Sequence, residues 1–191
     1  MTNLFEDNNV IAQGINSAHA SFRTKAMLSA GTNIITRTNS RKAGQKVEGI
    51  LVYDSIKDIQ ANSQIDINAI FVPAPFAKGT ILKAIVARVS LTICITEIIP
   101  IHDMLVVNKA LKNSASTLLG PNSPGSLLPG INKLAIIPAS MSLKGNTAIV
   151  SRSGTPNYEM VAGLMSICIG QKYVIGISGS VIHGMCYKEC M

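Results

Sequence analysis

The most constraining feature of the sequence is an alternation of short apolar runs with stretches of helical character. Runs rich in β-branched and aliphatic residues occur at residues 9–13, 32–36, 50–53, 69–72 and 91–95. Between them lie segments with helical spacing or capping residues, at residues 18–30, 54–61, 76–89 and 103–111. Continuous apolar strands that alternate with helices are typical of parallel sheets buried on both faces. The sequence therefore predicts an α/β fold with a doubly wound parallel sheet.

The character of the chain changes at residue 120. Residues 120–144 open with a dense set of glycines and prolines, which is typical of a linker or of functional loops. The pattern then restarts with a strand at 148–150, a helix at 158–169 and a strand at 173–177. We therefore expect a first domain at 1–125, a linker with loops at 126–145 and a second domain at 146–191. Because one β-α-β unit cannot cover its own faces, we expect this second domain to be truncated.

Composition excludes several classes of protein. Hydrophobic residues make up 47% of the chain and charged residues 14%, which indicates a globular rather than a disordered protein. The apolar runs end well short of the roughly 18 residues that a membrane helix needs, so no membrane association is expected. The first residues, MTNLFEDNNV, are acidic, which is unlike a signal peptide.

The four cysteines are expected to be reduced. His183, Cys186 and Cys190 have the spacing H-x2-C-x3-C, but only three ligands are present, so no metal site is expected.

The net charge of +7 includes one local cluster, formed by Arg37, Arg41, Lys42 and Lys46. Three interpretations remain open for it: a solvated basic loop, a phosphate-binding loop or a nucleic-acid contact. No aromatic residues interleave with the cluster, which disfavours single-stranded nucleic acid as a ligand.

Several loops follow predicted strands, where ligands bind in doubly wound folds. Thr96 and Glu97 end one strand and either accept hydrogen bonds from a ligand or begin a helix. Prolines in residues 72–76 indicate an open loop or a strand terminator. Residues 120–125, GPNSPG, indicate a loop of fixed shape. Residues 151–155, SRSGT, precede a helix and form a credible anion or phosphoryl site, because helix amino-termini present N–H groups.

Four segments carry a family resemblance in this order: IFVPAPFAKGTILKAI, ITEIIPIHDML, LLGPNSPGSLLPG and IVSRSGTPNYE. Together they resemble the alpha subunit of succinyl-CoA synthetase, also called succinate--CoA ligase, over nearly the whole chain. NDP-forming acyl-CoA synthetases and ATP-citrate lyase share some of these segments. The resemblance implies a Rossmann-like CoA-binding domain followed by the beginning of a flavodoxin-like domain.

The resemblance also implies roles for individual residues. Ser153 and Gly154 fall on the helix start that receives a phosphorylated histidine, and Tyr158 falls on a substrate-binding tyrosine. His19, His102 and His183 do not align with that histidine, so no catalytic residue is expected here. The residues implied in CoA binding are Asn16, Ser17, Ala18, His19, Lys42, Ile95, Thr96 and Glu97.

The implied activity is the joining of succinate and CoA at the expense of a nucleoside triphosphate, through a phosphohistidine, in the tricarboxylic acid cycle. The implied partner is a beta subunit, in a heterodimer or heterotetramer, which binds ATP or GTP with Mg. The implied location is the cytoplasm of a bacterium or the mitochondrial matrix of a eukaryote. The alternatives are a non-catalytic CoA-binding module and an inactive truncated remnant.

The chain departs from the family pattern at glycines. Ser17 and Ala20 replace glycines of the first loop, and Ile98 replaces the glycine of TEGIP. Ser123 replaces the cysteine usual in GPNCPG. If the replaced glycines have positive φ, each substitution costs roughly 1–2 kcal/mol. We therefore expect weak CoA binding, because Ser17 and Ala20 crowd the phosphate-binding loop.

Overall fold

A computed structural model describes residues 5, 8–14, 18–38, 43–47 and 49–190 of the chain. Within these residues the chain forms a sheet of seven strands and a second sheet of four. The first sheet has the order β3-β4-β2-β1-β5-β6-β7. Its strands are β1 (Val10–Gln13), β2 (Ile34–Thr38), β3 (Lys46–Val47), β4 (Ile50–Tyr53), β5 (Ile67–Ile70), β6 (Leu91–Cys94) and β7 (Thr117–Leu119).

The first sheet has the strand order of dinucleotide-binding folds. The six strands from β4 to β7 are all parallel, and β1 and β5 lie side by side where the strand order reverses. Two-residue β3 pairs antiparallel with β4 at one edge. The predicted Rossmann-like sheet is confirmed, and its reversal point is where such folds bind ligands.

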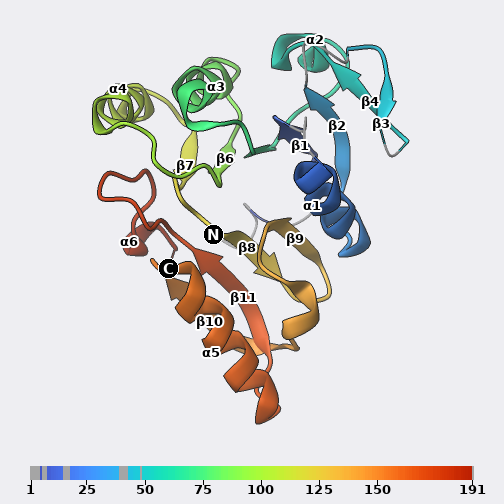
Figure 1. Cartoon of the computed structure of the whole chain (residues 1–191), viewed down its shortest axis with the longest axis vertical. Helices are drawn as coiled ribbons and strands as arrows, with labels where there is room; N and C mark the ends of the chain where they lie inside the picture. The colour runs from blue at the N-terminus through green and yellow to red at the C-terminus, as the bar shows by residue number, and fades with distance from the viewer. Residues whose placement is uncertain (1–4, 6–7, 15–17, 39–42, 48, 191) are drawn as a thin grey trace.

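One face of this sheet is covered by three helices (Figure 1). Ile81 from α3 and Met104 from α4 pack against Ile70 and Cys94 of the sheet. Further along, Ile56 of α2 packs near Ile11, Ala84 and Val89. The helices of the first part of the chain are α1 (Ala18–Ser29), α2 (Ile56–Gln60), α3 (Ala74–Val86) and α4 (Ile101–Lys112).

The opposite face is covered by α1 and by the second sheet. Met27 of α1, Ile67 and Ile93 of the first sheet, and Leu134 and Ile175 of the second belong to one buried cluster. The two sheets therefore share a core. The second sheet has the order β10-β11-β8-β9. Its elements, with the neighbouring helices, are β8 (Gly125–Leu128), β9 (Asn132–Ala135), η2 (Ala139–Met141), β10 (Lys144–Ser151), α5 (Gly154–Ser166), β11 (Gln171–Gly176) and α6 (Tyr187–Cys190).

The second sheet corrects one expectation. Residues 126–145 were expected to be a linker with loops, but they contain most of β8 and all of β9. These strands form an antiparallel pair, and β8 also pairs antiparallel with β11. In turn, β11 is parallel to β10, so β10, α5 and β11 form the expected β-α-β unit. The strands β8 and β9 thus extend the sheet of this unit, and the unit is covered.

Local signals placed most element boundaries within a few residues. Ser55 caps α2 through its hydroxyl, and Asp58 completes the capping box, as the sequence indicated. Gly31 has φ of 89° and follows the end of α1, so it marks the helix stop. Of the two interpretations of residues 72–76, the open loop is wrong, because Pro73 is the N-cap of α3 and Pro75 lies in its first turn.

Among the described residues, no helix is both long and apolar enough to cross a membrane.

Candidate functional site

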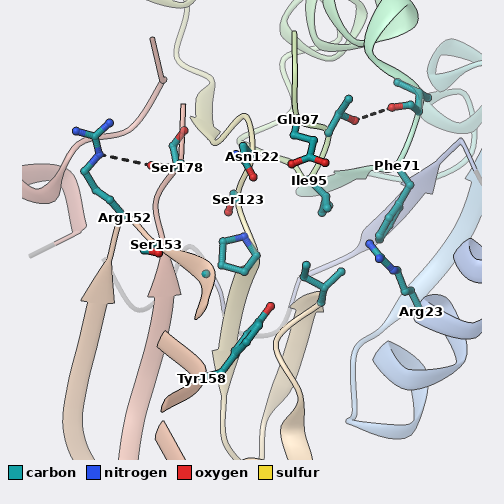
Figure 2. A pocket seen from close by; sticks show the side chains of 16 residues that line it. Arg23, Phe71, Ile95, Glu97, Asn122, Ser123, Arg152, Ser153, Tyr158 and Ser178 are labelled. Atoms are coloured by element: carbon teal, nitrogen blue, oxygen red, sulfur yellow. Dashed lines mark hydrogen bonds between the residues drawn. The ribbon is translucent and has the colours of Figure 1, made fainter. Parts of the chain in front are cut away.

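A cavity of about 1110 Å³ opens between the two sheets, at the carboxyl ends of β5 and β6 (Figure 2). It lies beside the reversal point of the first sheet, and the amino-terminus of α5 faces it from the other side. The lining residues used below are Arg23, Phe71, Ile95, Thr96, Glu97, Asn122, Ser123, Arg152, Ser153, Gly154, Tyr158 and Ser178.

The wall that follows β6 is held in place by hydrogen bonds to its neighbours. The Thr96 hydroxyl donates to the carbonyl oxygen of Val72 at 2.6 Å, and the Asn122 amide donates to the Thr96 carbonyl at 2.9 Å. Glu97 is exposed, and Ile98 follows it with φ of 58°. Ile98 therefore meets the condition of positive φ under which replacing the family's glycine costs stability. The structure thus uses the Thr96 hydroxyl to join two strand ends.

The loop of residues 120–125 forms the floor between the sheets, as its glycines and prolines indicated. Gly120 has φ of 111°, and a Cβ there would lie 2.4 Å from the Cys94 carbonyl oxygen. The Ser123 hydroxyl donates to the Gly176 carbonyl at 2.6 Å and accepts from the Gly125 amide at 2.9 Å. The peptide bond between Gly120 and Pro121 is cis. These contacts attach the floor to β11, so the cavity is built from both sheets.

The wall from the second sheet is the start of α5. Ser153 is the N-cap residue, its amide donates to the Ser151 hydroxyl at 3.1 Å, and Gly154 begins the helix. The Arg152 guanidinium donates to the carbonyl oxygens of Ser178 and Ser180, at 3.4 and 2.9 Å. An α-helix carries a partial positive charge at its amino-terminus, which stabilises an anion. This wall therefore suits a phosphate or a carboxylate.

Tyr158 lines the cavity from below and Arg23 lines it from the right in Figure 2. Burial raises the pKa of the half-buried Tyr158 hydroxyl, and the nearby Arg23 guanidinium partly opposes that shift. Burial lowers the pKa of Lys133 in β9, and the positive charge of Arg23 adds to the effect. The Tyr158 hydroxyl is therefore protonated at neutral pH and available as a hydrogen-bond donor.

The structure brings together the described residues that the sequence predicted for the site. All six with described side chains line the cavity: Ile95, Thr96, Glu97, Ser153, Gly154 and Tyr158. Ala18 and His19 lie in the first turn of α1, where the structure describes the backbone but not their side chains. Asn16, Ser17 and Lys42 lie outside the described residues.

The predicted basic cluster does not form a solvated loop as a whole. Arg37 lies in β2 and its side chain is 1% exposed, while Lys46 lies in β3 at the edge of the sheet. Arg41 and Lys42 lie outside the described residues. The prediction grouped Arg37 with the basic loop because it precedes other basic residues in the sequence. In the structure, the register of β2 turns its side chain inward.

The histidine and cysteines near residue 183 do not form a metal site in the described structure. The His183 Nδ1 atom lies 3.0 Å from the Met185 carbonyl oxygen, and the buried Cys190 thiol contacts the Met185 sulfur at 3.2 Å. Across the described part of the chain, no group of three or more His, Cys, Asp or Glu side chains is arranged to hold a metal ion.

Sequence reasoning missed the contributions of Arg23, Phe71 and Ser178. Arg23 lies in the second turn of α1, where a cation ordinarily indicates a solvated face. Ser178 is buried, and its hydroxyl donates to the Pro121 carbonyl oxygen. Phe71 follows β5 directly, so its place at a strand end was the one signal available.

Comparison with known proteins gives a consistent result. The CoA binding domain family matches residues 5–98. The alpha 2 subunit of an Archaeoglobus fulgidus succinate--CoA ligase [ADP-forming] is 39% identical over 97% of this chain and 65% of its own length. The corresponding Staphylococcus aureus alpha subunit is 40% identical over 95% of this chain and 61% of its own. The chain thus spans just under two thirds of these relatives.

Solved structures show the same fold at low sequence identity. A Ca. Korarchaeum cryptofilum dinucleotide forming acetyl-coenzyme A synthetase 1, in complex with phosphate and ADP, has a TM-score of 0.83 at 20% identity. It is matched over 98% of this chain and 41% of its own. The Methanothrix soehngenii ATP citrate lyase, in complex with citrate and coenzyme A, has a TM-score of 0.80 at 17% identity, over 94% and 32% of the two chains. In sequence the chain is thus similar to succinate--CoA ligase alpha subunits, and its residues 5–98 match the CoA binding domain.

Proposed function

We propose that this chain is the CoA-binding part of a succinate--CoA ligase alpha subunit and that CoA binds in the cavity between the two sheets. The CoA binding domain match at residues 5–98 and the identity to named alpha subunits support the ligand. The cavity supports the place, because it lies at the carboxyl ends of parallel strands, where doubly wound folds bind ligands.

One observation carries this proposal. A single cavity is lined both by Ile95, Thr96 and Glu97, the expected CoA contacts, and by Ser153 and Gly154 at the start of α5. A CoA molecule held against the first set would therefore share a space with the helix terminus that stabilises phosphoryl charge. The phosphates of CoA would be held near the start of α1, by Asn16, Ser17, Ala18 and His19, with Lys42.

In the proposed reaction, succinate and CoA are joined as a nucleoside triphosphate is hydrolysed, with a phosphohistidine as the intermediate. Tyr158 would contact the substrate from the cavity wall. His102 is exposed on α4, and neither it nor His183 lines the cavity, so neither is proposed as the phosphorylated residue. We therefore expect no phosphohistidine on this chain by itself.

The proposed assembly includes a beta subunit, as a heterodimer or heterotetramer, that binds ATP or GTP with Mg. Such an enzyme would act in the bacterial cytoplasm or in the mitochondrial matrix. A second candidate function is CoA binding without catalysis. A third candidate is an inactive remnant, which the positive φ of Ile98 favours over a CoA-binding module, because a non-glycine residue there strains the backbone beside the predicted CoA contacts.

The proposal is tested by blocking the cavity without disturbing the fold. A Cβ added at Gly154 meets no atom within 4 Å, and Gly154 lines the cavity. We expect Gly154→Phe to weaken CoA binding at least tenfold in isothermal titration calorimetry. Gly163→Phe is the matched control, because Gly163 lies in the same helix with equally open space and does not line the cavity. Equal CoA affinity in the two variants would show that CoA does not bind here.

A further inference from the structure

Arg23 brings a charged side chain to a part of the cavity that the motif residues do not reach. It lies one turn before Met27, on the side of α1 that faces the second sheet. Its side chain is half-buried and lines the cavity together with Phe71 and Tyr158. Figure 2 shows the guanidinium directed toward Phe71, at the opposite end of the cavity from Arg152.

The charges around Arg23 are not balanced by a carboxylate in the described structure. Among the described residues the ion pair present joins Lys78 to Asp103, which lie on α3 and α4, away from the cavity. Besides burial, the charge of Arg23 affects the pKa of two described groups, the cation Lys133 and the phenol Tyr158. Glu97 is the single carboxylate among the described lining residues, and it lies on the wall after β6. The corner around Arg23 therefore has a positive potential.

This potential is unlike that of an ordinary surface arginine. A guanidinium in a partly desolvated cavity interacts more strongly with an anion than one in bulk water does. Its planar arrangement of N–H groups matches the oxygens of a carboxylate or a phosphate. The protonated Tyr158 hydroxyl supplies a further donor in the same cavity. A neutral ligand would leave the charge of Arg23 uncompensated.

We propose that Arg23 is an anion-binding residue of this site, which with the Tyr158 hydroxyl receives a carboxylate or phosphate group of the bound ligand. The inference rests on the proposed function, since it assigns part of the same cavity. The anion has two possible sources, the acid substrate or the phosphates of CoA, and both present the same oxygen chemistry to Arg23.

The test removes the charge of Arg23 and keeps most of its length. Arg23→Met and Arg23→Lys are titrated with succinate, inorganic phosphate, CoA and pantetheine, which lacks the phosphates of CoA. We expect Arg23→Met to lose about tenfold in affinity for the anion that it contacts, because hydrogen bonds to charged groups contribute strongly. Arg23→Lys should recover part of that loss. Pantetheine affinity should not change.

Arg88→Met is the matched control, because Arg88 is exposed at the end of α3 and does not line the cavity. A loss confined to succinate assigns the acid, and a loss for CoA but not for pantetheine assigns a phosphate of CoA; both support the inference. The inference is overturned if Arg23→Met and Arg88→Met bind every anion with the same affinity. It is also overturned if Arg23→Met loses as much affinity for pantetheine as for CoA, or if the wild-type chain binds none of the anions. If Gly154→Phe still abolishes CoA binding while Arg23→Met has no effect, this inference fails and the proposed function stands.

Discussion

Replacing Ile98 by glycine removes a local strain that both the sequence and the structure place next to the predicted CoA contacts. Ile98 has φ of 58° and its side chain is 85% exposed. In the left-handed region the Cβ of an L-residue crowds the backbone, and a β-branched side chain is worse than most. Because the side chain is largely in water, its removal sacrifices little buried apolar area.

The expected magnitude follows from two opposing terms. Relief of the left-handed conformation contributes roughly 1–2 kcal/mol. The greater freedom of glycine in the unfolded chain costs roughly 0.5–1 kcal/mol. We therefore expect Ile98→Gly to raise the free energy of unfolding by about 1 kcal/mol. For a chain of this size, that corresponds to an increase in Tm of about 2–4 °C.

The assay is urea denaturation followed by circular dichroism, with Val181→Gly as the control. Val181 is also β-branched and 85% exposed, but it is not among the described residues with positive φ. We expect the control to lose stability by roughly 0.5–1 kcal/mol through backbone entropy alone. If Ile98→Gly lost as much stability as Val181→Gly, strain at Ile98 would be refuted.

Three further predictions concern stability. Arg88 occupies the left-handed position after α3, with φ of 55°, and the next amide, that of Val89, donates to the Ala84 carbonyl. Arg88→Gly should therefore raise the free energy of unfolding by about 1 kcal/mol, measured by urea denaturation. Gly125→Ala should lower the midpoint of thermal unfolding strongly, because its Cβ would lie 1.9 Å from the Leu134 carbonyl oxygen; an unchanged midpoint would contradict the pairing of β8 with β9. Burial raises the pKa of the Cys94 thiol to about 11 from 9.0. The stability that this shift contributes to the folded state is complete below pH 9 and is lost as the pH rises toward 11. Stability measured from pH 8 to 11 should fall less steeply in Cys94→Ala than in the wild-type chain.

Much of the first sheet could be predicted because its signals are local. Ala69 and Ile70 are buried on opposite faces of β5, so this part of the strand is readable without knowledge of its neighbours, although the preceding Asn68 is polar and buried. The sequence marked Ile98 as a position where the family has a glycine, and the structure showed that its φ is positive.

The pairing of β8 and β9 was not readable from local pattern. Each has four residues, and both lie among glycines and prolines that indicate loops. β8 is held by β11, where Val174 pairs with Leu127 across 47 positions of sequence, and β9 is held by β8. Arg23 was missed for a related reason. Its position in the helical pattern of α1 does not indicate that a second sheet packs against that face of the helix.

The sequence by itself determined the alternation of strands and helices, the shape of the loop at residues 120–125 and the motif residues of the site. The tertiary structure decided that the second sheet packs on the first, so that Arg23 and Tyr158 line one cavity between them. The physical reason is the range of the interactions. Periodicity, capping and glycine geometry act over a few residues and leave a trace in the sequence, whereas strand pairing and the potential of a cavity depend on residues far apart in the chain that folding brings together.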